Sequence, residues 1–203
     1  MKKRLLLTCF LISAICCSAQ YASTRRVYEI ICTKGNPADL LNMGFVQAEF
    51  NFGDIGSSWN LPTENDYLRF KILHYYILNH RKEGEHWKKQ FKENRQLLDE
   101  RFDRYMKSRL KKRPLKVSTE FTNTPYKLIV SYIDKSENVQ HENFYAVYSF
   151  INAKTGKLVV QFSVEEVTYK HTAWSGGYVV NSNEQLLELS IQMSNYLKKL
   201  LKE

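Results

Sequence analysis

The hydrophobic pattern of this chain changes its period near Pro114, and that change limits the folds open to it. In the segment that leads up to Pro114, residues 87–105, the apolar residues recur at helical spacing and form one narrow stripe, made of Trp87, Phe91, Leu98, Phe102 and Tyr105. Pro114 then ends the helix. From Tyr126 onward apolar and polar residues alternate, which indicates half-buried strands. Because helices and strands are grouped along the chain, the pattern predicts an α+β domain.

The other segments complete the order β-β-α-α-β-β-β-α. Strands are predicted at 25–33, at 45–52, from 126, at 144–151 and from 158, with a hairpin at 153–156 before the last. Residues 144–151 are apolar on both faces, as in a central strand. A helix capped by Thr63 should fade near 79–80, with an apolar stripe of Leu68, Ile72, Tyr75 and Tyr76. A last helix follows a capping box at Ser182. We expect about five strands in a two-layer, mainly antiparallel sheet, with helices on one face.

The first 19 residues read as a cleavable export signal. A basic start precedes an apolar run at 5–17, and Ser18-Ala19 provides a small-residue cleavage site before Gln20. The run is shorter than the roughly 20 residues of a membrane span. We therefore expect one domain over 20–203, periplasmic or secreted, without a transmembrane segment. The alternative is an outer-membrane lipoprotein anchored at Cys16 or Cys17, although neither cysteine follows the small residue that such cleavage prefers.

Removal of the signal changes the cysteine content and the charge. Of the four cysteines only Cys32 remains, so an internal disulfide cannot form. Cys32 lies in an apolar run and is expected to behave as a small buried residue. The whole chain carries a net charge of +9, and residues 87–113 hold eleven Lys or Arg against four Asp or Glu. The positive charge is therefore concentrated on one predicted helix.

This basic helix, residues 87–113, is a candidate anion-binding element. Its cations would contact the phosphates of lipid head groups or an anionic envelope polymer, and the candidate residues are Arg104, Lys107, Lys111, Lys112 and Arg113. A solvated helix explains the same run, because cations are favoured near a helix C-terminus and opposite charges stand four residues apart. These pairs are Lys89–Glu93, Glu100–Arg104 and Asp103–Lys107. An exported protein seldom meets nucleic acid, so no nucleic-acid partner is expected.

A second candidate site is an aromatic segment near residue 174. Trp174, with Tyr169 and Tyr178, forms a candidate ligand-binding surface, since aromatic side chains on loops often bind ligands. A nucleophile elbow requires glycine two residues before the serine, and Ala173 stands at that position before Ser175. The five histidines include no pair with zinc-binding spacing. We therefore predict no catalytic residues, no metal site and no cofactor.

Several short motifs also resemble a known group of proteins. They are Glu64-x-Asp66-Tyr67, Gly84-x-x-Trp87, Arg95 and Phe102. With the order of elements, they resemble a family of small uncharacterised exported proteins of gut Bacteroidetes. The half with three strands and a helix is broadly similar to α+β domains of envelope lipoproteins and secretion accessory proteins. The resemblance implies an exported α+β domain and supplies no catalytic residues.

The leading hypothesis is a non-enzymatic exported binding or accessory protein, whose partner is an unidentified protein or envelope component. One alternative is an enzyme that acts on a small molecule or glycan. Another is an electrostatic binder of anionic envelope polymer or lipid through residues 87–113. A pocket of convergent polar groups with perturbed carboxylates would favour the enzyme. An exposed apolar patch or a sheet edge would favour the binding protein.

Overall fold

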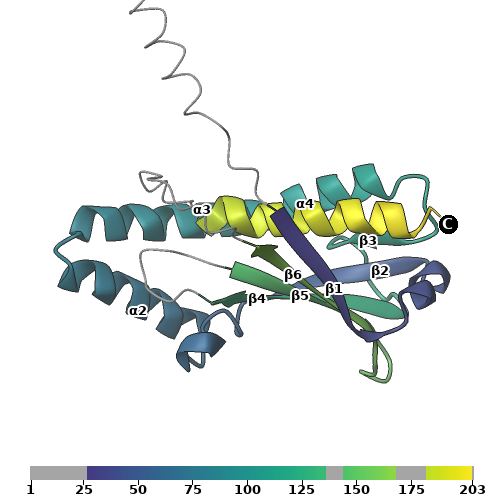
Figure 1. Cartoon of the computed structure of the whole chain (residues 1–203), viewed down its shortest axis with the longest axis horizontal. Coiled ribbons are helices and arrows are strands. Elements are labelled where there is room, and N and C mark those ends of the chain that lie inside the picture. Colours follow the sequence, from purple (N-terminus) through teal and green to yellow (C-terminus); the bar gives the residue numbers. More distant parts are fainter. Residues whose placement is uncertain (1–26, 136–143, 168–181, 203) are drawn as a thin grey trace, which may run out of the picture.

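The computed structural model describes residues 27–135, 144–167 and 182–202 (Figure 1). The predicted export signal at 1–19, with Cys16 and Cys17, lies outside these residues. In chain order the elements are β1 (Val27–Gly35), η1 (Pro37–Asn42), β2 (Phe45–Asn51), η2 (Ser57–Trp59), α2 (Glu64–Ile77), α3 (Arg81–Arg109), β3 (Lys116–Ser118), β4 (Tyr126–Asp134), β5 (Phe144–Asn152), β6 (Leu158–Val167) and α4 (Ser182–Leu200).

The strands form one six-stranded sheet in the order β1-β6-β5-β4-β2-β3. The pairs β1–β6, β6–β5 and β5–β4 are antiparallel, whereas β2 lies parallel to both β4 and β3. The parallel pairs follow from connectivity, because two helices separate β2 from β3 and β4 and provide a crossover. The α+β class is confirmed. The expected five strands were one too few, since three residues in β3 are too short to show an alternating pattern.

The core lies on one face of the sheet, beneath α4 and the second half of α3 (Figure 1). Val130, Tyr132, Phe150 and Phe162 point into it and are fully buried. Because β5 lies between β6 and β4, it is the central strand that the sequence predicted. Its alternate residues, such as Val147, are only half-buried, because none of the described helices covers the second face.

The helix α2 and residues 81–95 of α3 form a helical hairpin that extends beyond the sheet, and we call it the arm (Figure 1). The helices α3 and α4 therefore lie on one face of the sheet as expected, whereas α2 packs on α3. Aromatic rings join the two helices of the arm: Trp87 of α3 lies 6.3 Å from Tyr67 and 6.4 Å from Tyr75 of α2, and Phe91 lies 6.3 Å from Tyr67, between ring centroids.

The sequence predicted the ends of α2 to within two residues, but it predicted only part of the buried face. Thr63 caps the helix as predicted, because its Oγ1 accepts a hydrogen bond from the Asp66 N–H at 3.1 Å. The helix ends at Ile77, two residues before the predicted fade at 79–80. The buried positions are Tyr67, Leu68 and Lys71, whereas Tyr76 is exposed. The predicted stripe is therefore right at Leu68 and at Tyr75, which packs against the core, and wrong at Tyr76, since Lys71 takes an inward position.

Two smaller corrections concern the core. Along α3 the predicted stripe is buried as far as Phe102, but Met106 takes the last position and Tyr105 is only half-buried. Cys32, expected to be buried, is half-buried near the end of β1, where its Sγ lies 3.5 Å from the carbonyl oxygen of Lys34. The hairpin between β5 and β6 formed where predicted, with Gly156 at φ +68°.

Candidate functional site

The C-terminal end of α3 carries the cations that the sequence singled out. Arg104 pairs with Glu100 at 2.6 Å, as its four-residue spacing predicts, and Lys89 pairs with Glu93 at 3.8 Å. The third predicted pair, between Asp103 and Lys107, was wrong. The Asp103 carboxylate instead accepts hydrogen bonds from the Thr119 N–H at 2.8 Å and the Thr119 hydroxyl at 2.6 Å. Lys107 therefore has no carboxylate partner among the described residues.

The end of the helix is closed by a lysine from β3. The Lys116 Nζ donates hydrogen bonds to the carbonyl oxygens of Leu110 at 2.8 Å and Lys111 at 2.7 Å. The last carbonyls of a helix have no partner within it, so this contact satisfies groups that would otherwise require water. Since Lys116 satisfies these carbonyl oxygens, the ammonium groups of Lys107 and Lys111 are not required for that role and remain available to a ligand.

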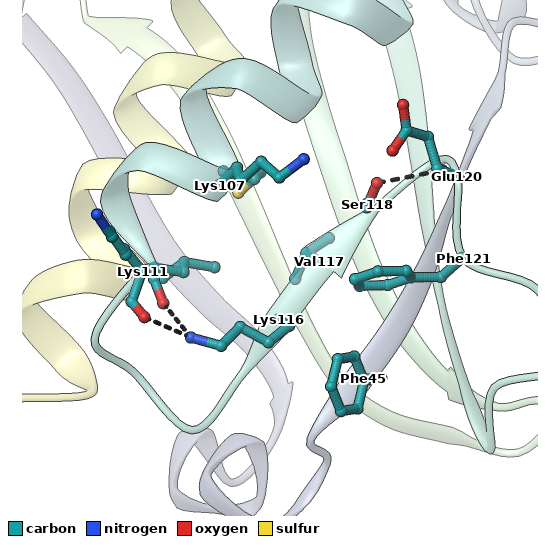
Figure 2. Close-up of a pocket in the computed structure, with 10 residues that line it drawn as sticks. Phe45, Lys107, Lys111, Lys116, Val117, Ser118, Glu120 and Phe121 are labelled. Atoms are coloured by element: carbon teal, nitrogen blue, oxygen red, sulfur yellow. Dashed lines mark hydrogen bonds between the residues drawn. The ribbon is translucent and has the colours of Figure 1, made fainter.

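Beside this helix end lies an apolar groove, which we call the β3 groove (Figure 2). Its cavity volume is about 260 Å³. Its apolar lining comes from α3, the start of β2, β3 and the chain after β3, and consists of Phe45, Met106, Leu110, Val117 and Phe121. The polar residues around it are Lys107, Lys111, Lys116, Ser118 and Glu120.

An aromatic pair forms one wall of the β3 groove. The rings of Phe45 and Phe121 meet edge to face, with centroids 5.3 Å apart and an interplanar angle of 77°. Phe45 is 58% exposed, which is high for a phenylalanine at the start of a strand. Its place follows from the register of the sheet, which puts Phe45 opposite Lys116 in the edge strand β3. An exposed aromatic pair beside cations is a surface suited to binding an apolar group.

The other predicted anion-binding residues do not line the groove. Lys112 follows the helix and is exposed, while Arg113 is half-buried with its Nε enclosed and without a hydrogen-bond partner among the described residues. Arg104 is held by Glu100 on the helix surface. Of the five predicted cations, the structure thus brings Lys107 and Lys111 together at one site.

A second hollow, of about 480 Å³, lies along the middle of α3. It contains the Asp99 carboxyl, whose pKa is raised by partial burial and by the neighbouring Asp103 carboxylate, while Arg95 opposes the shift. Most of the other polar groups here already have partners. Arg95 lies 3.3 Å from Glu64 and 3.9 Å from the centre of the Phe52 ring, and Glu49 pairs with Lys127. The hollow therefore presents one perturbed carboxyl and no paired acid and base.

A buried ion pair, which was not predicted from the sequence, lies at the base of the arm. Lys71 Nζ lies 2.9 Å from Asp134 Oδ2, and both side chains are fully buried. The Tyr67 hydroxyl donates a hydrogen bond to the same oxygen at 2.9 Å. Desolvating two charges is costly, so such a pair persists only with good geometry and further hydrogen bonds. It ties α2 to the end of β4.

A cluster of hydroxyl groups lies between the sheet and α4. The hydroxyls of Tyr132 and Tyr148 lie 3.1 and 3.3 Å from the Ser190 Oγ. Burial raises the pKa of both phenols well above the usual value. They stay neutral across the physiological range and hold α4 on the sheet.

The aromatic candidates Tyr169, Trp174 and Tyr178 lie outside the described residues. Within the described ranges, no group of three or more His, Cys, Asp or Glu side chains could hold a metal ion. Over the same part of the chain, no helix is long and apolar enough to cross a membrane.

Comparisons with known proteins give no family. No protein-family model matches the sequence, and no curated protein matches it. Among solved structures, a dodecamer of a PelC variant from Paraburkholderia phytofirmans is similar, with 11% identity and a TM-score of 0.39. The match covers 85% of this chain and 98% of the PelC chain. A TM-score this low carries no argument on function, and the resemblance to exported Bacteroidetes proteins stays a prediction.

Proposed function

We propose that this chain is an exported, non-enzymatic binding or accessory protein that holds a partner protein in the β3 groove. The observation that carries the proposal is the union of an apolar cavity with two lysines, Lys107 and Lys111, that no described carboxylate neutralises. Such a site favours a peptide segment in which one large apolar side chain stands next to carboxylates. Export rests on the predicted signal at residues 1–19.

The size of the groove supports a single anchoring side chain. Its volume of about 260 Å³ is below the ~300–1,000 Å³ typical of small-molecule pockets. In protein interfaces a few buried anchors supply most of the affinity, while charges at the rim mainly guide association. In the β3 groove Phe45 and Phe121 would surround the anchor, and Lys111 would lie at the rim.

Two alternatives make different use of the molecule. An enzyme acting on a small molecule or glycan would use the hollow at Asp99, where the raised pKa is the supporting observation. A purely electrostatic binder of anionic polymer or lipid would use the cations of α3 and the turn after it, without the apolar groove. It would lose affinity as much from Lys112→Gln as from Lys111→Gln.

The experiment measures binding of a labelled short peptide, with one Phe flanked by Asp residues, by fluorescence anisotropy. We expect Phe121→Ser to weaken binding about tenfold or more, because the anchor loses its wall. Lys111→Gln should weaken it about twofold, in keeping with an exposed charge, and high salt should remove that difference. Lys89→Gln, on the arm half of the same helix, is the matched control and should bind as the wild type does.

Unchanged binding by Phe121→Ser would contradict the proposal. Equal losses from Lys111→Gln, Lys112→Gln and Lys89→Gln, with none from Phe121→Ser, would favour the electrostatic binder. Phe121 contacts Phe45 near the surface and is only half-buried, so its replacement should leave the fold intact. Circular dichroism and thermal unfolding of each variant check this point.

A further inference from the structure

The free end of the arm exposes a cluster of apolar side chains. They lie in the last two turns of α2 and its cap, and are Leu73, Tyr76, Ile77 and Leu78; we call them the arm tip. Ile77 is 68% exposed and Leu73 is 59% exposed. Residues four apart lie on one side of a helix, so Arg69, Leu73 and Ile77 form one outward row. Exposed aliphatic side chains gathered in this way mark an interaction surface.

The packing within the arm explains why this row faces outward. The contacts between α2 and α3 are made by Tyr67 and Tyr75 on one helix and by Trp87 and Phe91 on the other. Gly84 allows the close approach, since a Cβ there would lie 2.8 Å from the Tyr75 Cβ. The hairpin is therefore closed without Leu73 or Ile77, and both remain at the surface.

Cations surround the arm tip. Apart from the buried Lys71, residues 69–89 hold five Lys or Arg, namely Arg69, Arg81, Lys82, Lys88 and Lys89. The same span holds two acids, and both are engaged within the arm. Glu83 lies 3.9 Å from the His80 Nδ1, and Glu85 accepts a hydrogen bond from the Tyr76 hydroxyl. The Arg81 guanidinium carbon lies 5.4 Å from the centre of the Tyr76 ring, so this cation stands directly beside the apolar cluster.

We propose that the arm tip docks on the surface of an anionic lipid bilayer. Leu73 and Ile77 enter the boundary between head groups and acyl chains, while Arg69, Arg81 and Lys82 contact the head-group phosphates. Aliphatic residues with cations on one helix are typical of helices that lie at membrane interfaces. The arm also ends as a projecting hairpin beyond the sheet, a shape suited to a flat surface (Figure 1). The arm tip lies at the opposite end of α3 from the β3 groove, so the inference goes beyond the proposed function.

The experiment measures co-sedimentation of residues 20–203, the predicted mature chain, with vesicles. It compares phosphatidylcholine alone with phosphatidylcholine mixed with phosphatidylglycerol. We expect binding to the mixed vesicles, and a loss on the order of tenfold in partitioning for the double variant Leu73→Gln, Ile77→Gln. The matched control is Leu41→Gln, Leu97→Gln, which removes two leucines that are 42% and 40% exposed outside the arm tip. All variants lack the predicted signal at 1–19, whose apolar run at 5–17 would itself bind vesicles, so differences between them arise from the substitutions.

A second pair of measurements separates the contribution of charge from that of insertion. Raising the ionic strength from about 0.1 M to about 1 M shortens the Debye length from ~10 Å to ~3 Å and should weaken binding. Arg81→Gln with Lys82→Gln should weaken it about fivefold or more at low salt. Ile77→Trp should strengthen binding, because Trp favours the membrane interface, and a folding defect would not produce that gain.

Equal partitioning of the arm-tip and control variants would overturn the proposal, as would equal binding to both kinds of vesicle. Sedimentation that shows a dimer of the chain in solution, lost with Leu73→Gln and Ile77→Gln, would assign the arm tip to a second copy and also overturn it. The peptide titration of the β3 groove is independent of these results, so the two proposals fail separately.

Discussion

Both halves of α3 contain basic and acidic residues, but the charged side chains of the two halves contact different groups. In the arm half, Lys89 pairs with Glu93 and Arg95 with Glu64, whereas Arg81 lies against the Tyr76 ring beside the arm tip. In the sheet half, Asp103 turns to Thr119 and leaves Lys107 beside the β3 groove. The difference shows that local spacing does not decide which cations are free. Within the described ranges, Lys107 is left without a carboxylate because Thr119, directly after β3, binds Asp103.

The two halves also differ in how they are held. The sheet half packs into the core through Leu98, Phe102 and Met106. The arm half packs mainly on α2, and α2 is itself tied to the sheet by the buried Lys71–Asp134 pair. The arm is therefore joined to the sheet through a buried ion pair, whereas the sheet half packs on it through apolar side chains.

The largest expected effect comes from breaking that pair. Lys71→Met removes the cation beside the buried Asp134 carboxylate, and should lower the free energy of unfolding by about 3–5 kcal/mol. The double variant Lys71→Met, Asp134→Leu should recover much of this loss, because no charge remains to be desolvated. Urea unfolding measures both. A loss below about 1 kcal/mol for Lys71→Met would show that the arm is held by its aromatic contacts instead.

A smaller effect is expected at the other end of α3. Lys116→Met keeps the apolar stem but removes the hydrogen bonds to the carbonyl oxygens of Leu110 and Lys111. Because these carbonyls can turn to water, the cost should be about 1 kcal/mol. Lys112→Met is the control for loss of an exposed charge and should be near neutral. Thermal unfolding compares the two variants. Equal stabilities would show that the hydrogen bonds of Lys116 do not stabilise the end of α3.

The smallest effect is expected at Asp99, near the middle of α3. Burial and Asp103 raise the pKa of Asp99, so the folded state binds its proton more tightly than the unfolded chain does. The ionised carboxylate is therefore slightly destabilising at neutral pH, and Asp99→Asn should raise the free energy of unfolding by a few tenths of a kcal/mol, since the residue is largely solvated. The gain should disappear below about pH 4, where Asp99 is protonated in both states. A gain that persists at low pH would point to another cause.

The sequence predicted the features that depend on neighbours along the chain. The Thr63 cap, the Glu100–Arg104 pair and the positive φ at Gly156 all follow from short-range rules. It missed the features that join distant segments. The burial of Lys71 depends on Asp134 at the end of β4. The β3 groove depends on Phe45 and Phe121 meeting across the edge of the sheet, and neither belongs to a periodic pattern. Its two lysines were among the five predicted cations, so that half of the site was visible in the sequence.

The most direct test of the central claim is a nuclear magnetic resonance titration of the chain with the Phe and Asp peptide. If the peptide binds in the β3 groove, amide shifts will concentrate at Phe45, at residues 116–121 and in the last turns of α3 near Lys107, and they will fade in Phe121→Ser. Shifts centred on Asp99 and Gln96 would assign binding to the hollow along α3. That result, or the absence of shifts at residues 116–121, would contradict the β3 groove as the binding site.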